Sequence, residues 1–175
     1  MSENIDHLKF PIGRFNAPEE ITLVHTKGWI EVIESFPERL NTATAELSEE
    51  ELEKQYRPNG WTIKQVVHHC ADSHMNSFVR FKLALTEDTP TIKPYHENLW
   101  AQLSDYKTPI ASSIKILEGL HKRWVLLLEN LNEADLEKQF IHPENNELIS
   151  LKKNIGIYAW HCNHHLAHIL IAKNN

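Results

Sequence analysis

The chain has few cysteines and no long apolar run among its 175 residues. Its two cysteines, Cys70 and Cys162, are too few for a disulfide framework, which favours a reducing compartment. No stretch approaches the ~18 apolar residues that a membrane span requires. The N-terminus, Met1-Ser2-Glu3-Asn4, lacks the positive start and apolar core of a signal peptide. We therefore expect a cytoplasmic protein that does not associate with a membrane.

Positive charge is also scarce. The chain has 18 Lys and Arg residues and 24 Asp and Glu residues, which gives a formal net charge of −6. Nucleic-acid binding needs a basic face, so we do not expect nucleic acid as a partner. The expected partner is a small-molecule substrate. Because domains are most often ~100–150 residues long, residues 1–175 are expected to form a single domain.

Four segments carry apolar residues at the three- and four-residue spacing of an amphipathic helix. They cover residues 18–40, 62–85, 112–131 and 151–172. Pro18 suits the first turn of the first helix, and Pro37 should kink that helix or mark its end. Thr62 and Gln65 form a capping-box pattern at the start of the second. Four such helices predict an all-α fold, a four-helix bundle.

Three segments lie outside these helices. Residues 1–17 show little periodicity and predict an extended N-terminal arm packed on the surface. Glu87–Pro109 contains three prolines and predicts a long connection with one helical turn around Glu97–Leu103. Connections of this length are often functional. Short apolar runs at Phe140–His142 and Leu148–Ser150, around the turn residues Pro143–Asn146, predict a small β-hairpin.

The last helix is rich in histidine, with four of the twelve histidines between Trp160 and His168. His161 and His165 are four residues apart and lie on one helix face, where two imidazoles can bind one divalent metal ion. His164 and His168 share that spacing, so spacing alone does not choose the pair. On a helical wheel His161 and His165 flank the apolar sector, whereas His164 projects from the far side and His168 lies farther out than His165. The wheel favours His161 and His165, and the alternative is a surface helix that happens to contain histidines.

The second helix offers a third ligand. Its histidines are His68, His69 and His74. The wheel points His68 outward and His74 into the apolar stripe, and it places His69 on the flank, in line with Ser73, Asn76 and Arg80. A core or surface histidine without a ligand role is the alternative for each. Three histidines from two helices would leave one tetrahedral position open, as in catalytic zinc sites. Cys162 follows His161 where the zinc-protease signature has glutamate, so the sequence identifies no general base.

The segments Gly60–Ser77, with its His68-His69 pair, and Tyr158–His168 resemble the metal-ligand helices of the DinB-like superfamily. The closer resemblance is to the branch described as metal-dependent hydrolases and also as bacillithiol S-transferases, and it extends from Phe10 to the end of the chain. It implies a four-helix bundle with a long crossover, a zinc or sometimes nickel ion on His69, His161 and His165, and a cytoplasmic homodimer. Two residues depart from the family pattern: Cys70 replaces a leucine, and Asn163 replaces a frequent histidine.

A metal ion on three imidazoles can activate water or hold a small thiol as its thiolate. The resemblance implies a metal-dependent hydrolase or a transferase of a low-molecular-weight thiol, with metal-bound water or thiolate as the reacting group. Asn76 and Arg80 are candidates to bind an anionic or sugar-like thiol. The thiol of Cys70, one residue from His69, could make the site redox-sensitive. The non-enzymatic alternative is a bundle whose metal joins two helices and whose polar stripe binds a protein partner.

Overall fold

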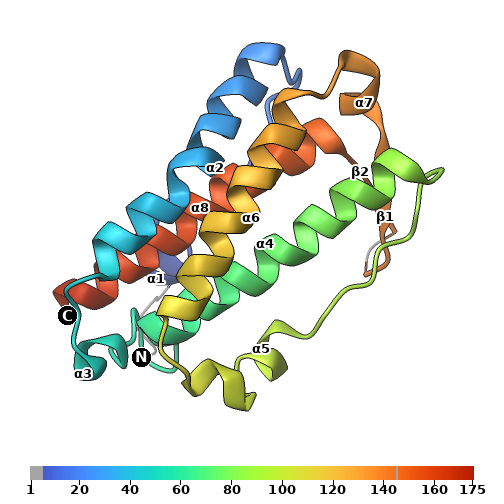
Figure 1. Ribbon diagram of the computed structural model, residues 1–175. Helices are drawn as coiled ribbons and strands as arrows, with labels where there is room; N and C mark the ends of the chain where they lie inside the picture. The colour runs from blue at the N-terminus through green and yellow to red at the C-terminus, as the bar shows by residue number, and fades with distance from the viewer. Residues whose placement is uncertain (1–5, 145) are drawn as a thin grey trace.

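The computed structural model describes residues 6–144 and 146–175. Four long helices form the bundle shown in Figure 1: α2 (Leu23–Thr44), α4 (Ile63–Thr86), α6 (Ala111–Glu129) and α8 (Leu151–Asn174). The shorter elements are α1 (Asp6–Lys9), α3 (Glu49–Leu52), α5 (Glu97–Trp100), the 3₁₀ turn η1 (Ser104–Lys107), α7 (Glu133–Glu137), β1 (Gln139–His142) and β2 (Glu147–Ser150). The prediction of an all-α four-helix bundle is confirmed. Within the described residues, no helix is both long and apolar enough to cross a membrane.

Helix α2 packs on α6 and α8, and α4 packs on the same two helices from the opposite corner. Helices α4 and α6 run in the same direction, so the segment between them must return along the length of α4 (Figure 1). The Gln65 side chain near the start of α4 donates to the Ala101 carbonyl oxygen at 3.1 Å, which ties the returning segment down. This segment is the predicted long crossover.

The helix starts follow local capping chemistry. The Thr62 side chain accepts from the Gln65 amide and the Gln65 side chain accepts from the Thr62 amide, so the predicted capping box of α4 is confirmed. The predicted start of α2 at Pro18 is wrong. Thr22 caps α2 and His25 completes its capping box, which leaves Pro18 in the arm. Helix α2 continues through Pro37 to Thr44, so this proline does not end it.

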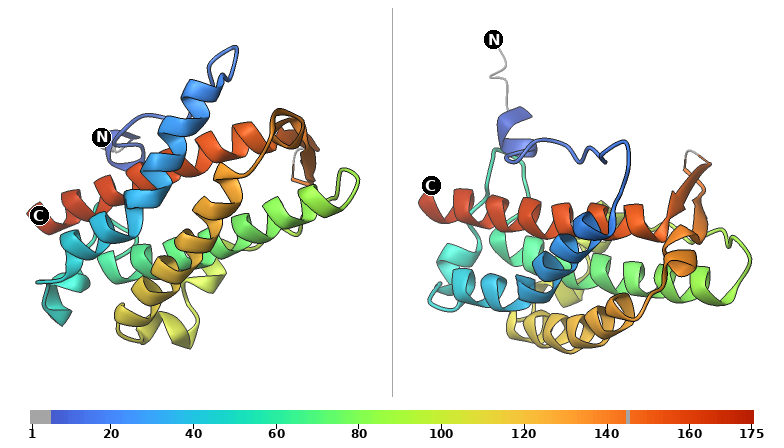
Figure 2. Two further views of the ribbon diagram at one scale, coloured as in Figure 1. Left: turned by 45° about the horizontal axis from the view of Figure 1, so that its top comes forward. Right: turned by 90° about the horizontal axis from the view of Figure 1, so that it is seen from above.

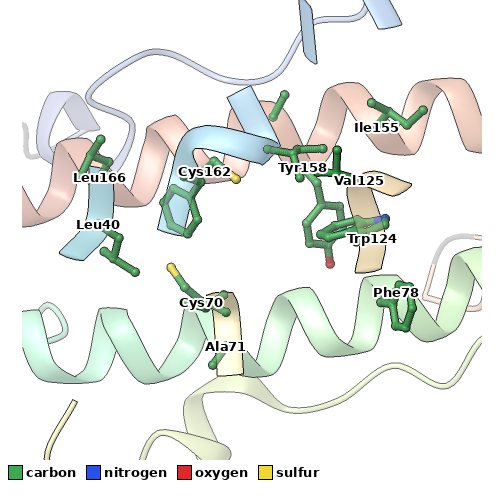
Figure 3. Packing of buried hydrophobic residues seen from close by; sticks show 14 of the residues in the cluster. Leu40, Cys70, Ala71, Phe78, Trp124, Val125, Ile155, Tyr158, Cys162 and Leu166 are labelled. Atoms are coloured by element: carbon green, nitrogen blue, oxygen red, sulfur yellow. The ribbon is translucent and has the colours of Figure 1, made fainter. Parts of the chain in front are cut away.

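The core lies between the four long helices. Trp124, Phe36 and Phe81 are among its largest fully buried side chains. Figure 3 shows Cys70 on α4 and Cys162 on α8 pointing into the same apolar space. Both are free thiols with no exposed surface, and they fill volume in the core.

The N-terminal arm lies along α8, on the side of α8 that faces away from α6 (Figure 2). The Trp160 indole N–H donates to the Gly13 carbonyl oxygen at 3.0 Å and fastens the arm there. The prediction of a packed arm holds for the described part, with one helical turn, α1, that was not predicted. Residues 1–5 of the predicted arm lie outside the described residues.

The predicted hairpin is present. Strands β1 and β2 pair antiparallel, with Phe140 opposite Ile149. Asn145 in the predicted turn lies outside the described residues. Thr91 adds an isolated parallel bridge to Ile141, so the start of the crossover is anchored to the hairpin. No pattern in the sequence indicates this bridge.

Candidate metal centre

The structure brings the three predicted histidines together. His69 from α4 and His161 and His165 from α8 each place a ring nitrogen within 4.8 Å of the other two. His69 and His165 are 4% and 7% exposed, whereas His161 is partly exposed. The i, i+4 spacing places the two α8 histidines on one face, and the packing of α4 on α8 supplies the third. The group is therefore largely enclosed by protein, and His161 is its most exposed member.

The spacing of the rings suits a small divalent ion. The Nε2 atoms of His69 and His161 are 3.2 Å apart, and the His161 and His165 ring centroids are 4.4 Å apart. Two nitrogens that bind one tetrahedral zinc ion at ~2.0–2.1 Å are ~3.3 Å from each other. The Nδ1 atom of His69 is buried without a hydrogen-bond partner among the described residues. An all-imidazole donor set with this spacing fits a zinc-like ion.

Burial keeps these imidazoles neutral, which is the form that binds metal. Desolvation, together with the nearby His164 and His168 rings, lowers the pKa of His69 to about 3. Desolvation also holds the pKa values of His161 and His165 well below their usual range, with neighbouring imidazoles adding to the effect. The three rings therefore present lone pairs at neutral pH without prior loss of a proton.

Hydroxyl groups line the neighbourhood of His161. The Ser73 Oγ atom lies 3.3 Å from His161 Nε2 and 3.2 Å from the Tyr158 hydroxyl oxygen. The Tyr158 hydroxyl also donates to the Ser73 carbonyl oxygen at 3.1 Å. Tyr95 approaches from the crossover: burial raises its pKa, and interaction with Tyr158 raises it further. Tyr158 and Tyr95 were not predicted, although Tyr158 stands three residues before His161 and so faces the same side of α8.

Two further histidines continue inward from the site. His161 Nδ1 lies 3.1 Å from His74 Nε2, and His74 Nδ1 lies 2.8 Å from His121 Nε2. His74 is fully buried on α4, as the wheel predicted, and His121 is 2% exposed on α6. Their contact could not be predicted, because it depends on how α4, α6 and α8 pack together.

The predicted outward positions of His68 and His164, and the prediction that His168 lies farther out than His165, are wrong. His164 and His168 are 7% and 2% exposed because the N-terminal arm covers this face of α8. The Phe10 ring lies 6.0 Å from the His164 ring, and His168 Nε2 lies 3.3 Å from the Lys9 carbonyl oxygen. His68 is buried beneath the crossover, with Nε2 3.1 Å from the Thr108 carbonyl oxygen. A helical wheel shows which side of a single helix is apolar, and it takes no account of the segments that cover the outside of the bundle.

The alternative pair, His164 and His168, also has metal-binding geometry. Together with His165 these residues place ring nitrogens within 4.8 Å of one another. All three lie on α8 and are buried, and the arm contacts His164 and His168. The group that contains His69 joins two helices and keeps partly exposed His161 beside hydroxyl groups, so it is the better candidate for chemistry.

With this geometry in view, the comparison with known proteins gives a clear result. A family model of the DinB superfamily matches residues 33–169. The chain belongs to the DinB superfamily. The structure of YfiT from Bacillus subtilis, described as a probable metal-dependent hydrolase with an unusual four-helix bundle topology, is similar with a TM-score of 0.91 and 44% identity over 94% of each chain.

Curated relatives agree over nearly the whole chain. A protein of Oceanobacillus iheyensis named "putative metal-dependent hydrolase" is 52% identical over 161 residues, which cover 92% of this chain and 93% of that protein. A Bacillus cereus protein with the same name is 52% identical over 165 residues, covering 94% and 95%. The predicted resemblance to the metal-dependent hydrolase branch of the DinB superfamily is confirmed.

The departures from the DinB pattern have structural roles here. The Arg39 guanidinium donates to the Asn163 side-chain oxygen at 2.9 Å and so links α2 to α8. Cys70 has no exposed surface, and burial raises the pKa of its thiol. A buried thiol with a raised pKa reacts slowly, which argues against a redox-sensitive Cys70.

Asn76 and Arg80 lie farther along α4, about 10 and 16 Å from His69 at the ~1.5 Å rise per residue of an α-helix. The Asn76 amide donates to the Asp72 carbonyl oxygen of its own helix at 2.9 Å. The Arg80 Nε atom is buried without a hydrogen-bond partner among the described residues. The structure therefore does not bring either side chain to the three histidines, and their substrate-binding role stays a prediction.

Proposed function

We propose that this protein is a metal-dependent hydrolase whose divalent ion is held by His69, His161 and His165. The observation that carries the proposal is the convergence of three neutral imidazoles from two helices within 4.8 Å, with one of them partly exposed. The relatives named as metal-dependent hydrolases support the same activity. Three ligands leave a fourth tetrahedral position for a reactant. Such an open position distinguishes catalytic zinc sites from closed structural ones.

The chain's own groups give the site its chemistry. A divalent ion held there would lower the pKa of a water ligand from ~15.7 to ~7. The Ser73 hydroxyl lies beside His161, and the Tyr158 hydroxyl, which donates to the Ser73 carbonyl oxygen, adds an oxygen that can accept a hydrogen bond from a polar substrate group. The Trp61 ring lies 4.6 Å from the His69 ring and shields that ligand from bulk water.

We propose zinc as the metal, with nickel as the alternative. Neutral imidazole binds zinc, copper, iron and nickel, so the donor type narrows the choice without fixing it. The tetrahedral spacing of the His69 and His161 nitrogens, at 3.2 Å, supports zinc. The cytoplasmic location and the homodimer also stay predictions. Light scattering in solution tests the homodimer.

The experiment that tests the function separates hydrolysis from thiol transfer. Chelated protein is reloaded with zinc or nickel and assayed in two arms: an ester or amide in water, and a low-molecular-weight thiol with an electrophilic acceptor. Turnover in water that chelation abolishes supports the hydrolase. Turnover that requires the thiol assigns the protein as an S-transferase instead. Bound metal without turnover in either arm supports the non-enzymatic alternative, in which the metal joins two helices and the polar stripe binds a protein partner.

A further inference from the structure

A proline in α2 leaves one backbone carbonyl group without its usual helical partner. The carbonyl of Ile33 would accept a hydrogen bond from the amide of residue 37, but residue 37 is proline and has no N–H. The Nδ1 atom of His121 on α6 lies 2.6 Å from this carbonyl oxygen. A histidine from a neighbouring helix thus replaces the missing donor, which explains how Pro37 is accommodated within a helix that continues to Thr44.

This contact fixes where the proton sits on His121. A carbonyl oxygen only accepts, so His121 Nδ1 must carry the hydrogen. A neutral imidazole has one N–H, so His121 Nε2 must then accept. Its neighbour at 2.8 Å is His74 Nδ1, which must therefore donate.

The same logic carries the assignment to the metal centre. Because His74 Nδ1 donates, His74 Nε2 must accept, and its neighbour at 3.1 Å is His161 Nδ1. With Nδ1 protonated, His161 keeps its lone pair on Nε2, the atom 3.2 Å from His69 Nε2. His74 has no exposed surface and packs against Phe36, with ring centroids 5.2 Å apart, so a charged ring there would be strongly disfavoured.

We propose that Pro37, by freeing the Ile33 carbonyl, sets the tautomer of His161 through His121 and His74, so that His161 offers Nε2 to the metal ion. This rests on the proposed metal centre. His74 and His121 are positioning residues, because they act through His161. The chain of hydrogen bonds ends at a carbonyl oxygen, which cannot release a proton, so it fixes a tautomer and does not form a proton exit.

The other ligand of α8 has a similar support. His168 Nε2 lies 3.3 Å from the Lys9 carbonyl oxygen and must donate to it, which leaves His168 Nδ1 as an acceptor. His165 Nδ1 lies 3.4 Å away and can donate to it, so His165 also keeps its lone pair on Nε2. In each case a backbone carbonyl outside α8 directs the same nitrogen toward the metal.

The direct test is the tautomer itself, measured by long-range ¹H–¹⁵N correlation NMR on metal-free, ¹⁵N-labelled protein at pH 7. We expect the hydrogen on Nδ1 and a bare Nε2 in His121, His74 and His161. A hydrogen on Nε2 of His161 would overturn the proposal even if the protein binds zinc. Conversely, the expected tautomers in a protein that binds no metal would refute the proposed function and leave the hydrogen-bond assignment standing.

A pair of variants tests the consequence for metal binding, measured as the zinc dissociation constant by competition with a chelator. His74→Leu removes the acceptor for His161 Nδ1–H and is expected to weaken binding 10- to 100-fold, the usual effect of losing such a partner. His74→Gln keeps an acceptor oxygen and is expected to restore most of the affinity. Equal affinity in His74→Leu and wild type would contradict the proposal. If His74→Leu does not fold, His121→Leu and His121→Gln provide the same comparison one hydrogen bond farther from the metal.

Discussion

The Nε2 atoms of His69 and His161 lie 3.2 Å apart, although the two residues are 92 positions apart in the chain. Two lone pairs at this distance repel unless a proton or a cation lies between them. In either case His69 Nδ1 is buried without a hydrogen-bond partner among the described residues. A shared cation resolves the contact by binding both nitrogens, so this pair is where metal should have its largest effect on the protein.

His165→Ala should remove the metal and leave the fold intact. His165 is not part of the apolar core of the four long helices. The melting temperature of the variant should therefore lie within a few degrees of that of chelated wild-type protein. Elemental analysis and calorimetry measure the two quantities. His96→Ala is the matched control, because His96 is exposed and makes no side-chain capping bond. Collapse of the fold in His165→Ala would assign the metal a structural role.

Acid should destabilise the metal-free protein. Burial lowers the pKa of His69 to about 3 and those of His121, His164 and His168 to about 4, from a usual value of 6.5. Below pH 6.5 the unfolded chain therefore binds more protons than the folded one, so the free energy of unfolding falls as the pH drops from 6.5 toward 4. Above pH 7 these groups should have no further effect. Urea unfolding of chelated protein at a series of pH values measures this, and a constant unfolding free energy between pH 7 and 4.5 would contradict it.

Two glycines in helices should respond oppositely to alanine. A Cβ atom at Gly156 on α8 would lie 2.9 Å from the Phe15 ring and 2.9 Å from the Trp29 ring. Gly156→Ala should therefore lower the free energy of unfolding by ~1 kcal/mol or more, although alanine has the better helix propensity. Gly119 on α6 has nothing within 4 Å of such an atom, and Gly119→Ala should stabilise by ~0.5–1 kcal/mol. Denaturant unfolding of both variants measures the two shifts. A gain in stability for Gly156→Ala would show that the arm does not pack closely on α8.

The thiols should be inert in the folded protein. Cys70 and Cys162 have no exposed surface, and burial raises both thiol pKa values. A thiol-specific reagent such as a soluble aromatic disulfide should react with neither in native buffer and with both after denaturation. Rapid reaction of native protein would restore the possibility of a redox-sensitive Cys70.

Local signals in the sequence predicted the parts of this protein that depend on local chemistry. The capping box of Thr62 is contained within a few residues, and the i, i+4 spacing of His161 and His165 is fixed by the helix itself. The flank position of His69 also follows from one helix. These features favoured the three residues that the structure brings together, and the family resemblance implied the same three.

What could not be predicted depends on segments that meet only in the folded chain. The arm buries His164 and His168, and the crossover buries His68, so their outward positions on a wheel were misleading. Pro37 suggested a break in α2, yet His121 from α6 supplies the donor that the proline lacks. Neither effect leaves a periodic pattern in the sequence.

The most direct test of the metal centre is the metal content of purified protein and of His69→Ala, His161→Ala and His165→Ala, measured by elemental analysis with His96→Ala alongside. A three-imidazole site predicts about one divalent ion per chain in wild type and the control, loss of the ion from each of the three variants, and release of the ion on acidification. Full metal content in any of the three variants, or tight retention of zinc by wild-type protein at pH 4, would contradict the assignment.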